Sequence, residues 1–391
     1  MKLAERVAQL KPSATLAISA KAQELKAQGR DILSLSVGEP DFPTPEHIRD
    51  AAKKAMDEGF TRYTPVPGMP ALRKAAADYF NNFYDADAKA ENIIVTNGGK
   101  QGIYNLCQAL LNPGDHVLIP APYWVSYPPI VELAAAKPVI IPTAPEKGFK
   151  VTKADLEKSL TPKTRMLMLN SPSNPTGSCY TREELDAIAE WAVGKGIVVF
   201  SDEIYDRLVY GDVEPQSLCS WWRKYPDNFV IGNGVSKTFA MTGWRVGYTL
   251  AAPDIVSAMS RLQGQSTSNV CSISQKAALA ALDGGFEAVE PMRKAFERRR
   301  DLAMEIVNAW PDVVCPTPGG AFYIFPDVHL HYNERFPDST SLCSYLLDEA
   351  GVALVPGVAF GDDRCIRLSY AVDDDTLVKA LKKVETVLIS K

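Results

Sequence analysis

Short apolar runs alternate with amphipathic segments through the middle of the chain. Runs of aliphatic and β-branched residues, bounded by turn-forming residues, are typical of buried strands. We predict strands at 92–96, 115–120, 137–142, 164–170, 197–203, 228–234 and 244–252. Helices are predicted between some of these runs, at 98–111, 122–134 and 181–196. This alternation indicates an α/β fold with a largely parallel sheet that helices cover on both faces.

The two ends of the chain have a different pattern. An N-terminal arm at 3–10 precedes predicted helices at 17–29 and 45–59, with a short strand within 31–45. Near the C-terminus we predict a charged helix at 290–310, strands at 319–328 and 365–371, and an amphipathic helix at 373–391. We therefore expect a second, smaller α+β domain built from both ends. The predicted segments are 1–45 (the arm and part of the small domain), 46–290 (the large domain) and 291–391 (the small C-terminal domain).

Composition excludes several classes of protein. The chain has 391 residues, 46% hydrophobic and 23% charged, which suits a globular protein of more than one domain. A net charge of −5 argues against a nucleic-acid binder, and no apolar run reaches membrane-spanning length. The first residues lack the apolar core of a signal peptide. Seven cysteines without CxxC spacing indicate reduced thiols in a cytoplasmic protein.

Histidines are too sparse to suggest a metal centre. His329 and His331 form an H-x-H pair, but no further Cys/His cluster accompanies it. Structural and catalytic metal sites need three or four ligands. We expect a solvent-exposed pair and no metal.

Ligands of open α/β sheets bind beyond the carboxyl ends of the strands, so the residues that follow each predicted strand are candidates for a site. In chain order these are Gly98, Gly99, Lys100, Trp124, Tyr127, Asn174, Asp202, Tyr205, Ser236 and Lys237, and Arg245 adds a cation nearby. Taken singly, each has a plainer interpretation. The glycines suit a tight turn as well as an anion site, and an aromatic residue is more often part of a core.

Lys237 and Asp202 are the most unusual members of this set. Residues 233–248 surround Lys237 with small and apolar residues and contain no acidic partner. Asp202 ends a strongly apolar run, where an unpaired carboxylate is costly. Together the set provides an anion cradle, a flat aromatic ring, an amide, a carboxylate, a phenol and an amine. These suit pyridoxal phosphate, whose chemistry needs a lysine Schiff base and an acidic partner for the ring nitrogen.

The chain resembles class I aminotransferases of PLP fold type I, in the bacterial aspartate aminotransferase branch. The resemblance runs along nearly the whole chain and rests on motifs in one order. They are SVGEPDF, RYTPVPGMPALR, TNGGKQG, PYWVSYP, NSPSNPTG, SDEIYDRLVY, SKTFAMTGWRVGY and IRLSYA. S-K-x-x-x-x-x-G-x-R-x-G and S-N-P-T-G are the most specific of them.

The resemblance implies roles for the cofactor-binding and catalytic residues. Lys237 would form the Schiff base and act as general base, and Asp202 would keep the ring nitrogen protonated. Tyr205 and Asn174 would bind the ring oxygen, and Trp124 would stack on the ring. The phosphate would be held by Gly99, Lys100, Ser236 and Arg245, with Tyr63 contributed by a neighbouring subunit. The resemblance therefore implies a homodimer with shared active sites.

Substrate-binding residues follow from the same resemblance. Arg367 would clamp the α-carboxylate through a bidentate fork, and the Gly38 backbone would close over the substrate beside Trp124 and Asn174. Lys100, with Ser13 and Thr15, would bind the distal carboxylate of a dicarboxylic substrate, although a helix-start lysine can also be simply solvated. Gly234 departs from the family pattern, because many relatives carry a serine there.

The implied activity is ping-pong transfer of an amino group between L-aspartate or glutamate and 2-oxoglutarate or oxaloacetate. An aminotransferase acting on prephenate or aromatic amino acids fits the same motifs, and β-elimination or decarboxylation would need the same lysine and aspartate. A PLP-binding regulator would carry an added DNA-binding domain. A nucleotide-binding enzyme is disfavoured because GGKQG lacks the rest of a phosphate-loop motif.

Overall fold

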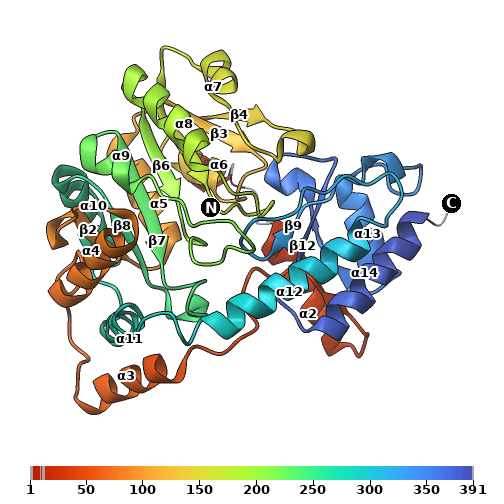
Figure 1. Cartoon of the computed structure of the whole chain (residues 1–391), viewed down its shortest axis with the longest axis horizontal. Helices are drawn as coiled ribbons and strands as arrows, with labels where there is room; N and C mark the ends of the chain where they lie inside the picture. Colours follow the sequence, from red (N-terminus) through yellow and green to blue (C-terminus); the bar gives the residue numbers. More distant parts are fainter. Residues whose placement is uncertain (1–2, 9, 11–13, 390–391) are drawn as a thin grey trace.

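A seven-stranded sheet forms the centre of the larger part of the molecule. The computed structural model describes residues 3–8, 10 and 14–389 (Figure 1). In spatial order the strands are β2 (Ile93–Thr96), β8 (Gly247–Leu250), β7 (Phe229–Gly234), β6 (Val198–Asp202), β5 (Thr164–Asn170), β3 (His116–Ala121) and β4 (Lys137–Pro142). β8 is antiparallel to both of its neighbours, β2 and β7, and the remaining neighbouring pairs in this sheet are parallel. The predicted α/β class with a largely parallel sheet is confirmed.

Helices cover both faces of this sheet because its strands are apolar on both sides. In β5, Met166 and Met168 point to one face, and Leu167 and Leu169 point to the other. The first face packs against α5 (Gly99–Leu110), α6 (Tyr127–Leu133) and α10 (Pro253–Ser266). The second packs against α4 (Pro70–Tyr84), α8 (Arg182–Lys195), α9 (Cys219–Lys224) and α11 (Ser272–Asp283). Two further helices of this part are α3 (Glu46–Asp57) and α7 (Lys153–Ser159).

Segments from the two ends of the chain lie beside this layered part: residues 14–27 and the C-terminal elements are on the right of Figure 1, whereas the N-terminus itself is drawn near the centre. Their helices are α1 (Glu5–Ala8), α2 (Ala14–Ala27), α12 (Glu290–Val307), α13 (Ser339–Asp348) and α14 (Asp374–Ile389). β1 (Leu33–Ser34) pairs with β10 (Val352–Ala353), and β11 (Val355–Pro356), β12 (Ile366–Ser369) and β9 (Tyr323–Ile324) form an antiparallel sheet. The domain boundaries at residues 45 and 290 stay a prediction.

Within the part of the chain that the structure describes, no helix combines the length and the apolar character needed to cross a membrane.

Candidate active site

The direction of the strands explains why residues distant in sequence meet at one edge of the large sheet. Asp202 ends β6 beside Asn170, the last residue of β5. Gly234 ends the adjacent β7, three residues before Lys237. β8 runs the other way, so its first residue, Gly247, pairs with the last residues of β2 and β7. Arg245, two residues earlier, therefore reaches the edge from the opposite direction.

A cavity of about 530 Å³ opens at this edge and collects most of the predicted residues. Its walls include Thr15, Gly38, Gly99, Lys100, Trp124, Asn174, Asp202, Tyr205, Ser236, Lys237, Arg245 and Arg367. Tyr63 is not among the lining residues, and its side chain is 90% exposed. The predicted contribution of Ser13 lies outside the described residues. Of the predicted site residues that the structure describes, only Gly98, Tyr127 and Tyr63 are not among the lining residues.

Lys237 presents its amine to the cavity without an anionic partner. Its Nζ donates to the carbonyl oxygen of Gly38 over 2.5 Å, and the described residues provide no carboxylate within ion-pair distance. Burial lowers the pKa of this amine to about 8, although the nearby Glu39 carboxylate acts in the opposite direction. A lysine with such a pKa carries a substantial neutral fraction near neutral pH, as a nucleophile or general base requires.

Asp202 is held rigidly below the cavity. Its Oδ2 accepts a hydrogen bond from the Tyr127 hydroxyl at 2.7 Å, and its Oδ1 accepts one from the Ile204 amide at 3.3 Å. Asn170 Nδ2 donates to the Asp202 backbone oxygen over 2.9 Å. Burial raises the pKa of the carboxyl to about 6, while the Tyr127 hydrogen bond acts to lower it. Such a carboxylate is suited to binding a cation, because a buried charge needs a partner.

A candidate anion site lies where α5 begins. Gly98 has a φ of +78°, and a Cβ there would lie only 2.1 Å from Arg245 Nη2. Behind it, a Cβ on Gly247 would lie 2.5 Å from the Gly99 amide nitrogen. Arg245 donates to the backbone oxygens of Thr242 (2.8 Å) and Asn97 (3.5 Å) and has no carboxylate partner among the described residues. A guanidinium that lacks a carboxylate partner and lies beside a helix N-terminus is typical of a phosphate or carboxylate site.

Arg367 forms a second cationic point in the cavity. Its side chain is buried, and Nη2 donates to the Ser36 carbonyl over 2.7 Å while Nη1 donates to Asn174 Oδ1 over 3.2 Å. Its buried Nε has no hydrogen-bond partner among the described residues. The guanidinium lies 4.6 Å from the Tyr323 ring centroid. A guanidinium that is held in place and still has an unpaired N–H group can bind a planar carboxylate.

Lys100 and Trp124 line the cavity and contact each other. Lys100 Nζ lies 4.9 Å from the centroid of the Trp124 ring. Partial burial lowers the pKa of this amine, and the charge of Arg245 acts in the same direction. Thr15 also lines the cavity, and its buried hydroxyl has no partner among the described residues. The Lys100 amine can bind an anionic group of a ligand.

Several residues of the site were missed or misjudged from sequence. Tyr127 was noted only as an aromatic residue, yet it hydrogen-bonds the Asp202 carboxylate. Asn170, whose Oδ1 accepts from the Asn174 amide at 2.7 Å, could have been noticed as a polar end to an apolar strand. Glu39 and Tyr323 also line the cavity. Tyr323 gave no local signal, because it belongs to a different part of the chain.

The next feature is the arrangement of possible metal ligands. Among the described residues, no group of three or more His, Cys, Asp or Glu side chains is arranged to hold a metal ion. The two ring nitrogens of His331 lie within hydrogen-bond distance of the backbone oxygens of Leu388 and Pro311. His329 lies 2.5 Å from Asp327 Oδ1.

The fold and the motifs together identify the class of protein. Residues 30–384 match the family described as Aminotransferase class I and II. The chain belongs to this family, as the motifs indicated, and is an aminotransferase.

Relatives that match this chain over nearly its whole length are named as aspartate or aspartate/prephenate aminotransferases. An aspartate aminotransferase from Geobacillus stearothermophilus is 46% identical, with 98% of both chains covered. An aspartate/prephenate aminotransferase from Cereibacter sphaeroides is 44% identical, again with 98% of both covered. The solved structure of aspartate aminotransferase from Thermus thermophilus with maleate superimposes with a TM-score of 0.94 at 43% identity. It covers 99% of this chain and 100% of that one.

Proposed function

We propose that this aminotransferase uses pyridoxal phosphate to exchange amino groups between L-aspartate or glutamate and oxaloacetate or 2-oxoglutarate, by a ping-pong mechanism. The observation that carries the proposal is the presence of three complementary groups in one cavity. They are the amine of Lys237, the buried carboxylate of Asp202 and the incompletely bonded guanidinium of Arg367.

The side chains around the cavity fit the chemistry of pyridoxal phosphate. A dianionic phosphate suits the start of α5, where Gly98 leaves space for Arg245 and where Gly99 and Ser236 line the cavity. Asp202 suits the protonated ring nitrogen, and Tyr205 and Asn174 suit the ring oxygen. Trp124 suits the face of the ring. When bound, this cofactor supplies an aldehyde carbon that captures the amine and a ring that accepts electrons.

Proton transfer falls to Lys237. Because its pKa is lowered to about 8, Nζ can accept the Cα proton of the substrate and later return it. Asp202 keeps its negative charge above a pH of about 6, so it can hold a neighbouring cation throughout the neutral range. The Tyr127 hydroxyl and the Ile204 amide fix the orientation of this carboxylate, and Asn170 holds the Asp202 backbone oxygen.

A dicarboxylic substrate suits the two cationic side chains of Arg367 and Lys100, which both line the cavity. Arg367 would bind the α-carboxylate through a planar fork, with the Gly38 backbone closing over the substrate. Lys100, with Thr15 and the predicted Ser13, would bind the distal carboxylate. Support comes from the Thermus thermophilus relative, whose solved structure contains maleate, itself a dicarboxylate. The second candidate is an aspartate/prephenate enzyme, as the Cereibacter sphaeroides relative is named.

The proposed assembly is a homodimer in which Tyr63 completes the phosphate site of the neighbouring subunit. Its support is the 90% exposure of Tyr63 in a single chain, outside the lining of that chain's own cavity. We also propose a cytoplasmic location, because all seven cysteines are unpaired.

Spectroscopy of the half-reaction tests the function. Purified protein is mixed with L-aspartate, then separately with L-phenylalanine, and the conversion of the cofactor absorbance is followed. Preferential conversion by aspartate is expected. Equal or faster conversion by phenylalanine supports the aromatic or prephenate candidate, and prephenate as amino acceptor then separates these two. Absence of any cofactor absorbance overturns the proposal.

Lys100→Met tests the distal-carboxylate assignment. We expect kcat/KM for aspartate to fall by about 10- to 100-fold, the loss of one charge-assisted contact, with little change for phenylalanine. Lys137→Met is the matched control, because Lys137 is an exposed lysine on β4 that does not line the cavity. An equal loss for both substrates would show that Lys100 acts on the cofactor rather than on substrate selection.

A further inference from the structure

Tyr323 lies where three parts of the site meet. Its side chain is buried, and its hydroxyl lies 3.0 Å from the hydroxyl of Tyr205. The Arg367 guanidinium lies 4.6 Å from the centroid of its ring. A Cβ on Gly38 would lie 2.6 Å from its hydroxyl oxygen, so only glycine leaves room for this phenol. Tyr323 therefore contacts Tyr205, which is proposed to bind the cofactor, and Arg367, which is proposed to bind the substrate. It also lies against the Gly38 backbone, whose carbonyl oxygen accepts from Lys237.

The hydrogen bond between the two hydroxyls can run in either direction. Its direction decides which phenol keeps a proton for another acceptor. Each phenol donates a single hydrogen bond. Among the described residues, each of these two hydroxyls has the other as its hydrogen-bond partner. Burial raises the pKa of both phenols, so both keep their protons. If Tyr205 donated to Tyr323, it would have no proton left for a ligand oxygen in the cavity.

We propose that Tyr323 is a positioning residue that donates its proton to Tyr205, which leaves the Tyr205 proton free for the ring oxygen of the cofactor. This inference rests on the proposed function. Donation into the Tyr205 oxygen polarises its O–H bond and makes it a stronger donor. The ring of Tyr323 has a second task, since its face supports the Arg367 guanidinium.

Backbone contacts hold the two tyrosines together. The segment after Tyr205 forms an isolated β-bridge between Val209 and Gly320, just before Tyr323. The Ala321 amide donates to the Leu208 carbonyl over 2.8 Å. These contacts come from the main chain, so they do not depend on either hydroxyl.

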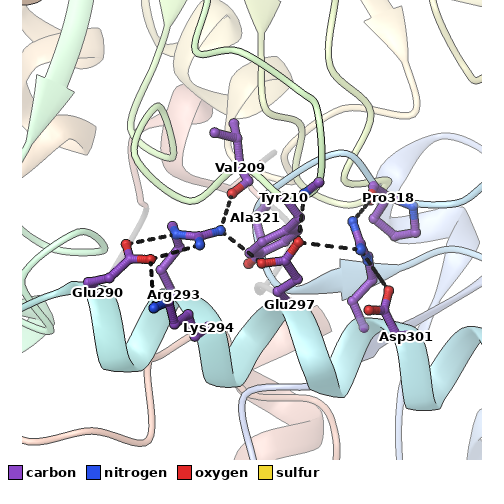
Figure 2. A network of polar contacts seen from close by, with 11 residues as sticks. Val209, Tyr210, Glu290, Arg293, Lys294, Glu297, Asp301, Pro318 and Ala321 are labelled. Carbon is purple, nitrogen blue, oxygen red and sulfur yellow. Dashed lines mark hydrogen bonds and ion pairs between the residues drawn. The ribbon is translucent and has the colours of Figure 1, made fainter.

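Helix α12 clamps the same segment from the other side (Figure 2). Arg293 Nη1 donates to the Val209 carbonyl over 3.0 Å, and the Gly211 amide donates to Glu297 Oε1 over 2.7 Å. Arg300 Nη1 donates to the Pro318 carbonyl over 3.3 Å. Replacing Tyr323 by phenylalanine should thus delete one hydroxyl and leave the ring in place.

The test is a pH titration of the cofactor absorbance in the holoenzyme, for wild type, Tyr323→Phe, Tyr205→Phe and the double variant. A hydrogen bond to the ring oxygen favours the anionic form of that oxygen. Loss of the Tyr205 donor should therefore move the midpoint of the absorbance titration to higher pH. We expect Tyr323→Phe to move it in the same direction by about half a pH unit, because Tyr205 becomes a weaker donor. The double variant should match Tyr205→Phe.

An unchanged or lower midpoint in Tyr323→Phe would overturn the inference, because it would mean that Tyr205 donates to Tyr323. A double variant that exceeds Tyr205→Phe would also overturn it, since Tyr323 would then act independently. The proposed function fails separately, if the wild type shows no titrating cofactor band. Steady-state kinetics give a second readout. Tyr323→Phe should keep KM for aspartate within about 3-fold, whereas Tyr323→Leu, which removes the ring, should raise KM by about 10-fold.

Discussion

Lys237 Nζ and the Gly38 carbonyl oxygen lie 2.5 Å apart, although 199 positions separate the two residues. The contact joins the loop after β7 to the segment that follows β1. It satisfies the buried amine with a neutral acceptor and leaves the amine without the counter-ion that would hold its proton. The low pKa of Lys237 is therefore a property of where these two segments meet.

The stability of the cofactor-free protein should depend on pH through Lys237. Its pKa is about 8 in the folded state against an ordinary 10.5, so the unfolded chain binds more protons between these values. The free energy of unfolding should therefore rise with pH across this window, by on the order of 3 kcal/mol. Denaturant unfolding at pH 7 to 10.5 measures it. Lys237→Met should flatten this rise, and Lys137→Met should not. A slope that persists in Lys237→Met would assign it to other groups.

Tyr127→Phe should shift the acidic limb of the activity profile. The Tyr127 hydroxyl stabilises the charged form of Asp202, whose pKa is about 6, so its loss should raise that pKa further. Activity should then fall at a pH about one unit higher than in the wild type. Tyr104→Phe provides the control, because Tyr104 is exposed and does not line the cavity. Identical acidic limbs would contradict the proposed role of Asp202.

Two glycines of positive φ should differ sharply when replaced by alanine. Gly98→Ala places a Cβ 2.1 Å from Arg245 Nη2 at a φ of +78°, so it should weaken phosphate binding and cost about 1–3 kcal/mol. Gly114→Ala is the matched control, because Gly114 has a φ of +87° but its Cβ would meet nothing within 4 Å, and it does not line the cavity. Cofactor dissociation constants and unfolding curves test both variants. An equal loss of cofactor binding in the two variants would contradict the role of Arg245.

Hybrid dimers test whether Tyr63 acts across the subunit boundary. Tyr63→Ala and Lys237→Ala should each impair activity. If Tyr63 serves the neighbouring subunit, mixing the two variants forms one intact site per hybrid dimer, with Lys237 from one chain and Tyr63 from the other. Activity measured after joint refolding should then exceed that of either variant alone. Hybrids that stay inactive would mean that Tyr63 serves its own chain or that no shared site exists.

The cofactor side of the site could be predicted from the sequence because each of its residues lies close to one end of a strand. Asp202, Lys237 and Arg245 lie within a few residues of the ends of β6, β7 and β8. The strand expected at 244–252 begins only at Gly247, because residues 242–244 form a 3-10 helix and Arg245 has a φ of +57°. That irregular entry places the guanidinium beside Gly98. No hydrophobic pattern encodes it.

The remaining contacts of the site depend on pairings that no local pattern reveals. Arg367 reaches Asn174 across 193 positions, and Tyr323 reaches Tyr205 across 118. Two-residue strands such as β1 and β10 are too short to give a period-2 signal. The family resemblance supplied the role of Arg367, whereas Tyr323 became visible only once the two parts of the chain were packed together.

The pairing of β1 with β10 also determines when the site can form. Arg367 Nη2 binds the Ser36 carbonyl across 331 positions, and the Leu33 amide donates to the Gly351 carbonyl over 2.8 Å. Residues 33–38 are made early by the ribosome but find these partners only after nearly the whole chain has been synthesised. Contacts of such long separation form late, since their loop-closure entropy must be met first. A nascent chain can therefore build its large sheet, but the substrate pocket must wait for the C-terminus.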